Sequence, residues 1–489
     1  MKTHANHAQT FRNVPATSKP LSESKVGALL DQEWARYKEG TSASEKENRL
    51  ATQSLPLGVP SSFQYWDPYP ISIKSAKGAW MVDMDDRPVL DLSMGFGAML
   101  AGHLNPVVVQ EIKESLEVGT LFVTPSPISR DAAELICKRF SLDQVRFTNS
   151  GTESTMYAIR TARAFTGKNG VVKVEGGYHG SYDPLTVSVK PKLDVVGDAE
   201  NPNSIVDPAT VVGDVFVVPY NDAEALERTF AKHKDKIACF VVEPVLENIA
   251  IVLPDAGYLE RVRELCDQYE IVLIFDEVFV GFRLAPGGAQ EYFGVRADMV
   301  TYGKTLGGGL PVGVVCGRKD LMKRFRDDKP ADICFARGTF NSHPYVMGAM
   351  QVFLERLNDF DVRLIYANLE NCWNTRADAL NQRLEAEGLP VRVSNMSSIW
   401  TVSYIQPSRY NWMLQYYLKS EGLLLSWVGT GRFIFSLNYT DADFTVVSNK
   451  FMKAARRMCW DGWWWQGTTL TNKSIKRSIF SELLKAKFN

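Results

Sequence analysis

A single lysine, Lys304, stands between a short apolar run at 299–302 and three consecutive glycines at 307–309. A lysine at the end of a buried strand loses hydration, so its pKa falls and its neutral amine becomes a nucleophile that forms a Schiff base with an aldehyde. The glycines follow the lysine instead of preceding it, and G-x-x-x-x-G-K-[ST] is absent from the chain, which argues against a nucleoside-triphosphate loop. The competing interpretation is an ordinary surface lysine at a loop entrance.

Other groups with chemical potential follow other apolar runs. Asp276 ends an apolar run at 271–275, where a carboxylate is poorly solvated unless a cation faces it. Ser150, Gly151 and Thr152 open a helical stretch, so their segment is either a phosphate seat or a simple helix cap. Tyr178 follows a pair of glycines and either lies flat on a planar ligand or is an ordinary buried tyrosine.

These groups together describe one ligand. It is planar, carries a phosphate and a basic ring nitrogen, and has an aldehyde that a lysine can capture, and pyridoxal 5′-phosphate meets all four demands. The sequence therefore predicts this cofactor, with Lys304 as its tether and Asp276 beside its ring nitrogen.

The elements that must position these groups form a βα series from about residue 100. Apolar runs alternate with helical stretches, which predicts an α/β fold with a mostly parallel sheet covered by helices on both faces. In such sheets ligands lie beyond the carboxyl ends of the strands, and the candidate groups follow those ends. The pairs of strand and following residues are "VRFTNSGT", "VVKVEGGYHG", "FVVEP", "VLIFDE" and "MVTYGK".

The predicted organisation has five parts. Residues 1–50 form a partly disordered N-terminal arm, 51–100 the N-terminal part of a small domain, and 101–345 the cofactor-binding large domain. Residues 346–457 form the C-terminal small domain, and 458–489 a Trp-rich tail. Within the tail, Ile475, Ile479 and Leu483 fall on one helical face, which predicts an amphipathic docking helix; a carrier-protein or membrane-surface contact is the alternative.

Composition restricts the class of protein. The chain has 489 residues, of which 45% are hydrophobic and 23% charged, and its net charge of -1 gives no electrostatic footprint for nucleic acid. No apolar run approaches the roughly 18 residues of a membrane span. Its 7 cysteines are dispersed without C-x-x-C spacing, which indicates reduced thiols and a cytoplasmic protein.

With these residues in view, the chain resembles the class III aminotransferases from about residue 57 to 447. "FTNSGTESTMYAIRTARAFTG", "GGYHG", "VVEP", "LIFDEVFVGFR", "TYGKTLGGGLPVG" and "RGTFNSHP" stand in the family's order and spacing. The resemblance implies a fold-type I enzyme with a seven-stranded sheet in the large domain and a smaller α+β domain. "LPLGVPSSFQYWDPYP", "GGAQEYFGVRADMVTYGK" and Asn248 place it nearest the branch of glutamate-1-semialdehyde aminomutases and β-amino-acid aminotransferases.

The resemblance also implies a role for each cofactor contact. Lys304 forms the Schiff base and then moves the proton, and Asp276 keeps the pyridine nitrogen protonated. Tyr178 and Val278 pack on the two ring faces, and Thr339 reaches the phosphate of the neighbouring subunit of a homodimer. The full set of implied cofactor contacts is Ser150, Gly151, Thr152, Tyr178, Asp276, Val278, Lys304 and Thr339.

The substrate residues depart from the family. Gln64 stands where aminomutases carry a carboxylate-binding arginine, and Ser62 where β-amino-acid enzymes carry theirs. Asn248 replaces a glutamate found in many ω-aminotransferases, and Arg432 is left to contact a substrate carboxylate from the small domain. We therefore expect a transaminase that moves an amino group between a small-molecule donor and a carbonyl acceptor. An intramolecular aminomutase and a non-catalytic scaffold of the same fold are the alternatives.

Overall fold

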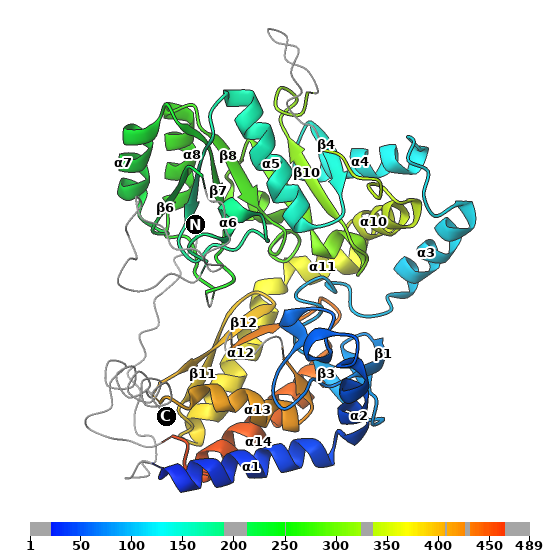
Figure 1. The fold of residues 1–489 in the computed structure, drawn as a ribbon, viewed down its shortest axis with the longest axis vertical. Coiled ribbons are helices and arrows are strands. Elements are labelled where there is room, and N and C mark those ends of the chain that lie inside the picture. The colour runs from blue at the N-terminus through cyan, green and yellow to red at the C-terminus, as the bar shows by residue number, and fades with distance from the viewer. Residues whose placement is uncertain are drawn as a thin grey trace.

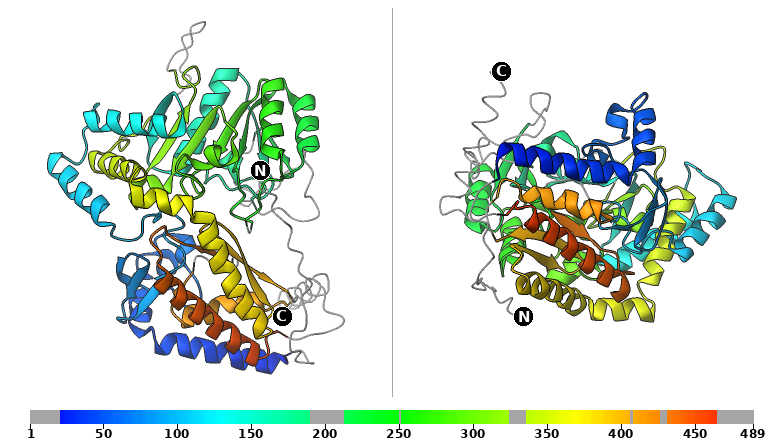
Figure 2. Two further views of the ribbon diagram at one scale, coloured as in Figure 1. Left: turned by 180° about the vertical axis from the view of Figure 1, so that it is seen from behind. Right: turned by 90° about the horizontal axis from the view of Figure 1, so that it is seen from below.

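The computed structural model describes residues 21–189, 213–249, 251–323, 336–405, 408–425 and 431–464. Two halves share the molecule: a large sheet with its helices in one half, and elements from both ends of the chain in the other (Figure 1). Figure 2 shows the same division from behind, and the first and last helices of the described chain are joined by the ion pair of Glu33 with Arg457.

The large half is built on a seven-stranded sheet in the order β4-β10-β9-β8-β7-β5-β6. All neighbouring strands run parallel except β10, which pairs antiparallel with both β4 and β9. Its central strands read as continuous apolar runs because both faces are covered. The strands are β4 (Gln144–Thr148), β5 (Gly170–Val174), β6 (Val215–Val218), β7 (Ile237–Val242), β8 (Val272–Asp276), β9 (Met299–Gly303) and β10 (Gly313–Gly317).

Helices cover this sheet on both faces (Figure 1). The helix α5 shows how sequence sets its ends: the Ser150 side chain accepts from the Glu153 amide at the start, and Gly167 ends it in the left-handed conformation. The helices of this half are α3 (Pro106–Val118), α4 (Pro127–Phe140), α5 (Gly151–Thr166), α6 (Asp183–Thr186), α7 (Ala223–His233), α8 (Tyr258–Gln268), α9 (Gly288–Phe293) and α10 (Pro344–Arg356), with the 3-10 turn η3 (Lys304–Gly307) after β9.

The smaller half joins two short sheets to helices. One sheet has the order β1-β2-β3-β13 and the other β11-β12-β14. Its strands are β1 (Ile73–Lys77), β2 (Trp80–Asp83), β3 (Pro88–Asp91), β11 (Val391–Met396), β12 (Ile399–Tyr404), β13 (Leu423–Leu424) and β14 (Arg432–Ile434). Its helices are α1 (Glu23–Glu39), α2 (Ser42–Ala51), α12 (Leu369–Ala386), α13 (Leu414–Ser420) and α14 (Asp441–Trp460), with α11 (Phe360–Ala367) between the halves and the turns η1 (Pro56–Gly58), η2 (Ser62–Gln64) and η4 (Asn411–Met413).

Arg283 ties the two halves together. Its guanidinium is fully buried and donates to the carbonyl of Phe435 at 3.0 Å and to that of Gly97 at 2.5 Å. Nearby, the Tyr366 hydroxyl donates to the Phe282 carbonyl at 2.5 Å. Because Phe435 directly follows the strand β14, this clasp fixes the small-domain strand relative to the loop that follows β8.

The predicted α/β fold class with its mostly parallel seven-stranded sheet is confirmed. The five-part division stays a prediction; α10, which spans the boundary drawn at 345, packs in the core of the large sheet. Trp463 and Trp464 are buried in the smaller half, whereas Trp465 and the predicted helix around 475–483 lie outside the described residues. No helix in the described chain has the length and apolarity to cross a membrane.

Candidate active site

The chemistry-bearing groups gather at one edge of the large sheet. Asp276 is the last residue of β8, and Lys304 directly follows β9, the neighbouring parallel strand. Lys304 has a φ of 42°, which a residue with a β-carbon rarely adopts, and such strain is concentrated at functional sites. The sheet topology therefore places the amine and the carboxylate on one side of the molecule, as the sequence predicts.

Cations and one aromatic ring surround the Lys304 amine. Its Nζ lies 4.5 Å from the centre of the Phe279 ring, and the Arg432 guanidinium lies 4.9 Å from the same centre. Burial, together with the positive charge of Arg432, lowers the pKa of Lys304 to about 8, although Asp276 and Glu243 act in the opposite direction. A lysine with this pKa is in part neutral near pH 8 and can act as a nucleophile.

Asp276 is held by a closed set of donors. Its carboxylate is 5% exposed and receives hydrogen bonds from the Val278 amide at 3.0 Å and the Thr301 hydroxyl at 3.2 Å. The Nδ1 of His179 lies 2.8 Å from its other oxygen. Burial lowers the pKa of His179 although Asp276 raises it, so the ring is neutral and donates through Nδ1–H. The Asp276 carboxylate is therefore held in place by three donors at the end of β8.

The residues that the sequence predicts as a phosphate seat lie at the start of α5. The Ser150 side chain is used as the helix cap, which leaves the amides of Gly151 and Thr152 among the first four of the helix, where no helical carbonyl can accept them. Gly180, with a φ of 88°, passes so close that an added β-carbon would lie 2.4 Å from the Thr152 Oγ1. This approach allows the Ser181 amide to donate to that oxygen at 3.2 Å.

Tyr178 and Val278 flank the space between these groups. The Tyr178 amide donates to the Glu243 carboxylate at 2.9 Å. Burial raises the pKa of the Tyr178 hydroxyl, and the negative charge of Asp276 acts in the same direction. Val278 packs so tightly on Gly151 that a β-carbon there would lie 2.8 Å from its methyl group. A buried amine, a carboxylate, an aromatic ring and the start of a helix thus lie in one region, and this set of groups fits pyridoxal 5′-phosphate.

Hydrogen bonds from Lys173 anchor the loop that carries Tyr178 and His179. This fully buried side chain extends from β5 and donates to three carbonyls, those of Gly177 at 2.8 Å, Leu185 at 3.0 Å and Val187 at 2.5 Å. Three acceptors match the three hydrogens of an ammonium group. Lys173 therefore holds the ligand-facing loop on the sheet.

Lys173→Met should destabilise the protein, because three buried carbonyls lose their donor at once. We expect a loss of about 2–4 kcal/mol in the free energy of unfolding, since each unsatisfied buried acceptor costs about 1 kcal/mol or more. Urea denaturation followed by fluorescence measures it, with Lys113→Met on the exposed face of α3 as the control. An unchanged denaturation midpoint would show that the three hydrogen bonds do not hold the loop.

The predicted substrate residues differ in their placement. Arg432 faces the site from β14: its Nη1 donates to the Glu247 carbonyl at 3.1 Å, and its guanidinium packs on Phe279. Asn248 is half-buried beside Glu247. Gln64 is exposed on η2, and within the described residues no hydrogen bond or ion pair joins its side chain to Lys304 or Arg432.

Thr339 is exposed on a turn that is hydrogen-bonded to the segment before α5. In that turn, Asn341 accepts a hydrogen bond from the Asn149 side chain at 2.9 Å, and Asn149 immediately precedes Ser150. The turn is also anchored to α5, because the Tyr157 hydroxyl donates to the Arg337 carbonyl at 2.6 Å.

Sequence reasoning missed five residues of this cluster. Phe279, His179 and Arg283 all lie within motifs that the sequence analysis quotes, but nothing in their spacing distinguishes them from packing residues. Glu243 directly follows the strand β7, and Glu247 lies four residues later. A buried acid after a strand was the available signal. The five are His179, Glu243, Glu247, Phe279 and Arg283.

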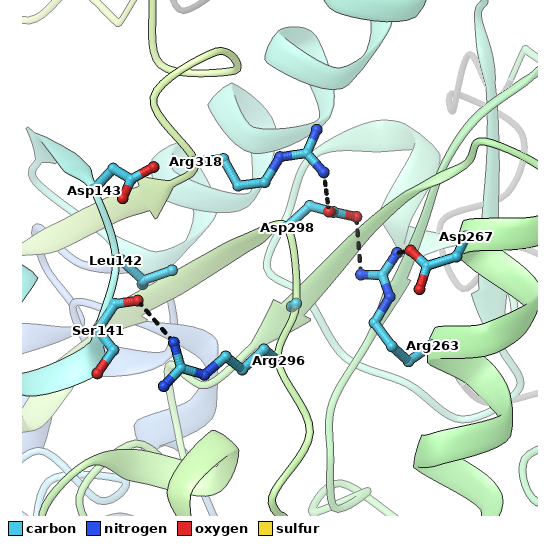
Figure 3. A pocket seen from close by; sticks show the side chains of 9 residues that line it. Ser141, Leu142, Asp143, Arg263, Asp267, Arg296, Asp298 and Arg318 are labelled. Atoms are coloured by element: carbon cyan, nitrogen blue, oxygen red, sulfur yellow. Dashed lines mark hydrogen bonds and ion pairs between the residues drawn. The ribbon is translucent and has the colours of Figure 1, made fainter.

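A second pocket of about 310 Å³ lies at the opposite edge of the large sheet (Figure 3). Asp298, which precedes β9, bridges Arg263 at 3.0 Å and Arg318 at 2.6 Å, and Arg263 also pairs with Asp267 at 2.6 Å. These charges neutralise one another inside the protein, so we do not consider this pocket a catalytic site. Its lining residues are Ser141, Leu142, Asp143, Arg263, Asp267, Arg296, Ala297, Asp298 and Arg318.

Comparison with known proteins gives consistent matches. The family model for aminotransferase class-III matches residues 63–455. A glutamate-1-semialdehyde 2,1-aminomutase from Methanocaldococcus jannaschii is 37% identical over 355 residues, which are 72% of this chain and 81% of that protein.

Two solved structures share the fold over most of both chains. An omega-transaminase from Sphaerobacter thermophilus has a TM-score of 0.78 at 29% identity, covering 86% of this chain and 98% of the other. A beta-phenylalanine aminotransferase from Variovorax paradoxus has a TM-score of 0.76 at 27% identity, covering 90% and 98%.

Proposed function

The chain belongs to the class III aminotransferases, enzymes that depend on pyridoxal 5′-phosphate, and from this premise we propose that it is a transaminase with a ping-pong mechanism. The donor is an amine or amino acid of the β or ω type, and the acceptor is a 2-oxo acid or another carbonyl compound. The observation that carries the proposal is the meeting of a partly neutral lysine and a buried carboxylate at the ends of adjacent strands.

Each residue has a distinct task in this proposal. When bound, the cofactor supplies an aldehyde that takes up the amino group and a ring that withdraws electrons from the reacting carbon. The Lys304 amine holds the cofactor and, once released, removes and returns the proton at the amine-bearing carbon. Asp276 keeps a proton on the ring nitrogen, with the neutral His179 as its fixed donor. Gly151 and Thr152 bind the phosphate through the helix start.

The remaining predicted contacts support binding and orientation. We assign Tyr178 and Val278 to the two ring faces, and Ser150 to the helix cap that shapes the phosphate seat. Arg432 is placed to contact a substrate carboxylate, and Asn248 to line the same region. Gln64 stays a prediction for the substrate mouth, where the neighbouring Phe63 ring packs 6.0 Å from Phe96 and favours a hydrophobic substrate part.

The second candidate is an intramolecular 2,1-aminomutase, which the M. jannaschii relative favours. The absence of the aminomutase arginine at Gln64 argues against it, because a substrate with a carboxylate loses its bidentate partner. A non-catalytic scaffold is disfavoured by the intact pair of Lys304 and Asp276.

Separated half-reactions distinguish the candidates. Holoenzyme mixed with one equivalent of an amino donor, in the absence of acceptor, should lose the absorbance of its Schiff base and release a carbonyl product. Addition of a 2-oxo acid should then restore the absorbance. With excess substrate and no acceptor, an aminomutase would instead turn over many times, and a scaffold would show no spectral change with any donor tested.

The proposed working unit is a homodimer in the cytoplasm. Val118 is 72% exposed, Val123 70% and Phe340 57%, and they surround the contact in which His343 lies 2.8 Å from the Thr120 carbonyl. Burying such a patch against a second copy favours association. It would also carry the exposed Thr339 to the partner's phosphate seat. The dispersed free cysteines support a reducing compartment.

The lowered pKa of Lys304 predicts the pH dependence of cofactor capture by the cofactor-free protein. Only the neutral amine attacks an aldehyde, and with a pKa of about 8 roughly a quarter of the amines are neutral at pH 7.5, against about 0.1% for an ordinary lysine. The capture rate should therefore rise with pH and level off above about 8. Stopped-flow absorbance measures it. A rate that keeps rising tenfold per pH unit up to pH 10 would contradict the assigned environment of Lys304.

A further inference from the structure

Glu247 is a buried acid whose carboxylate has no partner. Its side chain is 3% exposed, and neither oxygen forms a hydrogen bond within the described part of the chain. An unsatisfied buried acceptor destabilises a protein, and such groups are rare in native structures. A carboxylate left in this state at a binding site indicates that a ligand supplies the missing donor.

The position of Glu247 relates it to the reacting groups. It lies in the loop after β7, next to Asn248, and its carbonyl accepts the Arg432 Nη1 at 3.1 Å. The Arg432 guanidinium shares the Phe279 ring with the Lys304 amine. The cations that act on the Glu247 carboxylate are Arg432, Arg283 and Lys304, and Glu247 itself raises the pKa of the neighbouring acid Glu243. Glu247 therefore borders the region where a substrate bound at Lys304 must extend.

The two arginines do not satisfy this carboxylate. Arg283 directs its terminal nitrogens to the carbonyls of Phe435 and Gly97, and Arg432 directs Nη1 to the main chain of Glu247. Both guanidiniums stabilise the negative charge of Glu247 at a distance, but its two carboxylate oxygens stay open to another donor. The negative charge of Glu247 in turn weakens the attraction of Arg432 for a second carboxylate.

We propose that Glu247 is a specificity-determining residue that accepts a hydrogen bond from the part of the amino donor beyond the reacting amine. The enzyme then favours donors that carry an amide, hydroxyl or second amine at that place, and it disfavours donors with a carboxylate there. A carboxylate would meet like charge in a buried site, whereas an N–H or O–H group would satisfy an oxygen that is otherwise unpaired. This inference rests on the proposed transamination at Lys304.

The discrimination should depend on pH. Burial raises the pKa of Glu247 to about 7, while Arg432, Arg283 and Lys304 lower it. Above this value the ionised group repels a carboxylate, and below it the neutral acid itself offers a proton to one. The preference for the uncharged donor should therefore grow as the pH rises from 6 to 8.5.

A matched pair of donors tests the inference. β-Alanine and β-alaninamide have the same length and the same reacting amine, and they differ only in a terminal carboxylate or carboxamide. The ratio of kcat/KM for the amide to that for the acid is measured at pH 8.5 in the unmodified holoenzyme and in Glu247→Gln. We expect this ratio to fall at least tenfold in the variant, mainly through a gain for β-alanine, because the glutamine amide offers a donor and carries no charge.

The control is Glu260→Gln, which removes the same charge from an exposed position on α8 and should leave the ratio unchanged. Intrinsic differences between the two donors cancel when the ratio is compared between variants. An equal ratio in the unmodified enzyme and Glu247→Gln, with both donors reacting, overturns the inference and leaves the proposed transamination intact.

A binding measurement does not depend on turnover. The melting temperature of the holoenzyme should rise more with β-alaninamide than with β-alanine, and Glu247→Gln should remove the difference. If neither compound is converted but the difference in melting temperature appears and depends on Glu247, the inference stands and the proposed reaction fails. If the two compounds shift the melting temperature equally in both proteins, the inference is wrong.

Discussion

Lys304→Ala should abolish transamination, with a fall in kcat of roughly 10⁴-fold or more, because one change removes both the covalent tether and the proton-transfer group. The bound cofactor should also lose the absorbance of its Schiff base. Steady-state turnover with a donor and a 2-oxo acid measures the first effect, and a visible absorbance spectrum of the purified protein measures the second.

The control for this variant is Lys319→Ala, since Lys319 is exposed just beyond β10 at the opposite edge of the sheet. Its turnover and spectrum should match those of the unmodified protein. Small exogenous amines should restore part of the activity of Lys304→Ala, because they replace the missing base without replacing the tether. Full turnover and an unchanged spectrum in Lys304→Ala would end the proposed mechanism.

Asp276→Asn should lower kcat by roughly 10²- to 10⁴-fold, the range over which a positioned charge or proton-transfer group contributes. The amide keeps the shape of the carboxylate, but it carries no negative charge to hold a proton on the ring nitrogen. We expect the substitution to slow the removal of the proton from the donor. A donor deuterated at the amine-bearing carbon would then show a larger kinetic isotope effect on kcat.

Neighbouring variants separate charge from packing at Asp276. Thr301→Val removes only the hydroxyl that donates at 3.2 Å and should change kcat by less than about tenfold. His179→Asn keeps a hydrogen-bond donor near the carboxylate and should lower kcat more than Thr301→Val but less than Asp276→Asn. If Asp276→Asn retained the kcat of the unmodified enzyme, the carboxylate would have no part in the chemistry.

The sequence predicts most of the cofactor set because its signal is local. Gly151 stands three residues after β4, Asp276 is the last residue of β8 and Lys304 directly follows β9, and parallel strands bring their carboxyl ends to one edge. Once an apolar run is interpreted as a strand, the residue after it is expected at this edge of the sheet. The helix cap at Ser150 was also local, and the structure shows its side chain bound to the Glu153 amide.

The surroundings of Lys304 were not predictable in this way. Phe279 and Arg432 are 153 positions apart in the chain, and their contact arises because the smaller half folds over the large sheet. Alternation along a strand of three residues does not determine which face of β14 the arginine occupies. The lowered pKa of Lys304 depends on these distant contacts and on burial, so it follows from packing alone.

The amino-acid sequence by itself determined the fold class and the cofactor and predicted the residues proposed to bind it, because strand periodicity and the residue after each strand are properties of short segments. Only the tertiary structure decided which charges face one another: Arg432 above Phe279, His179 on Asp276, and Glu247 buried without a donor. Electrostatic interactions depend on distance in space and on burial, and neither is written in the spacing of residues along the chain.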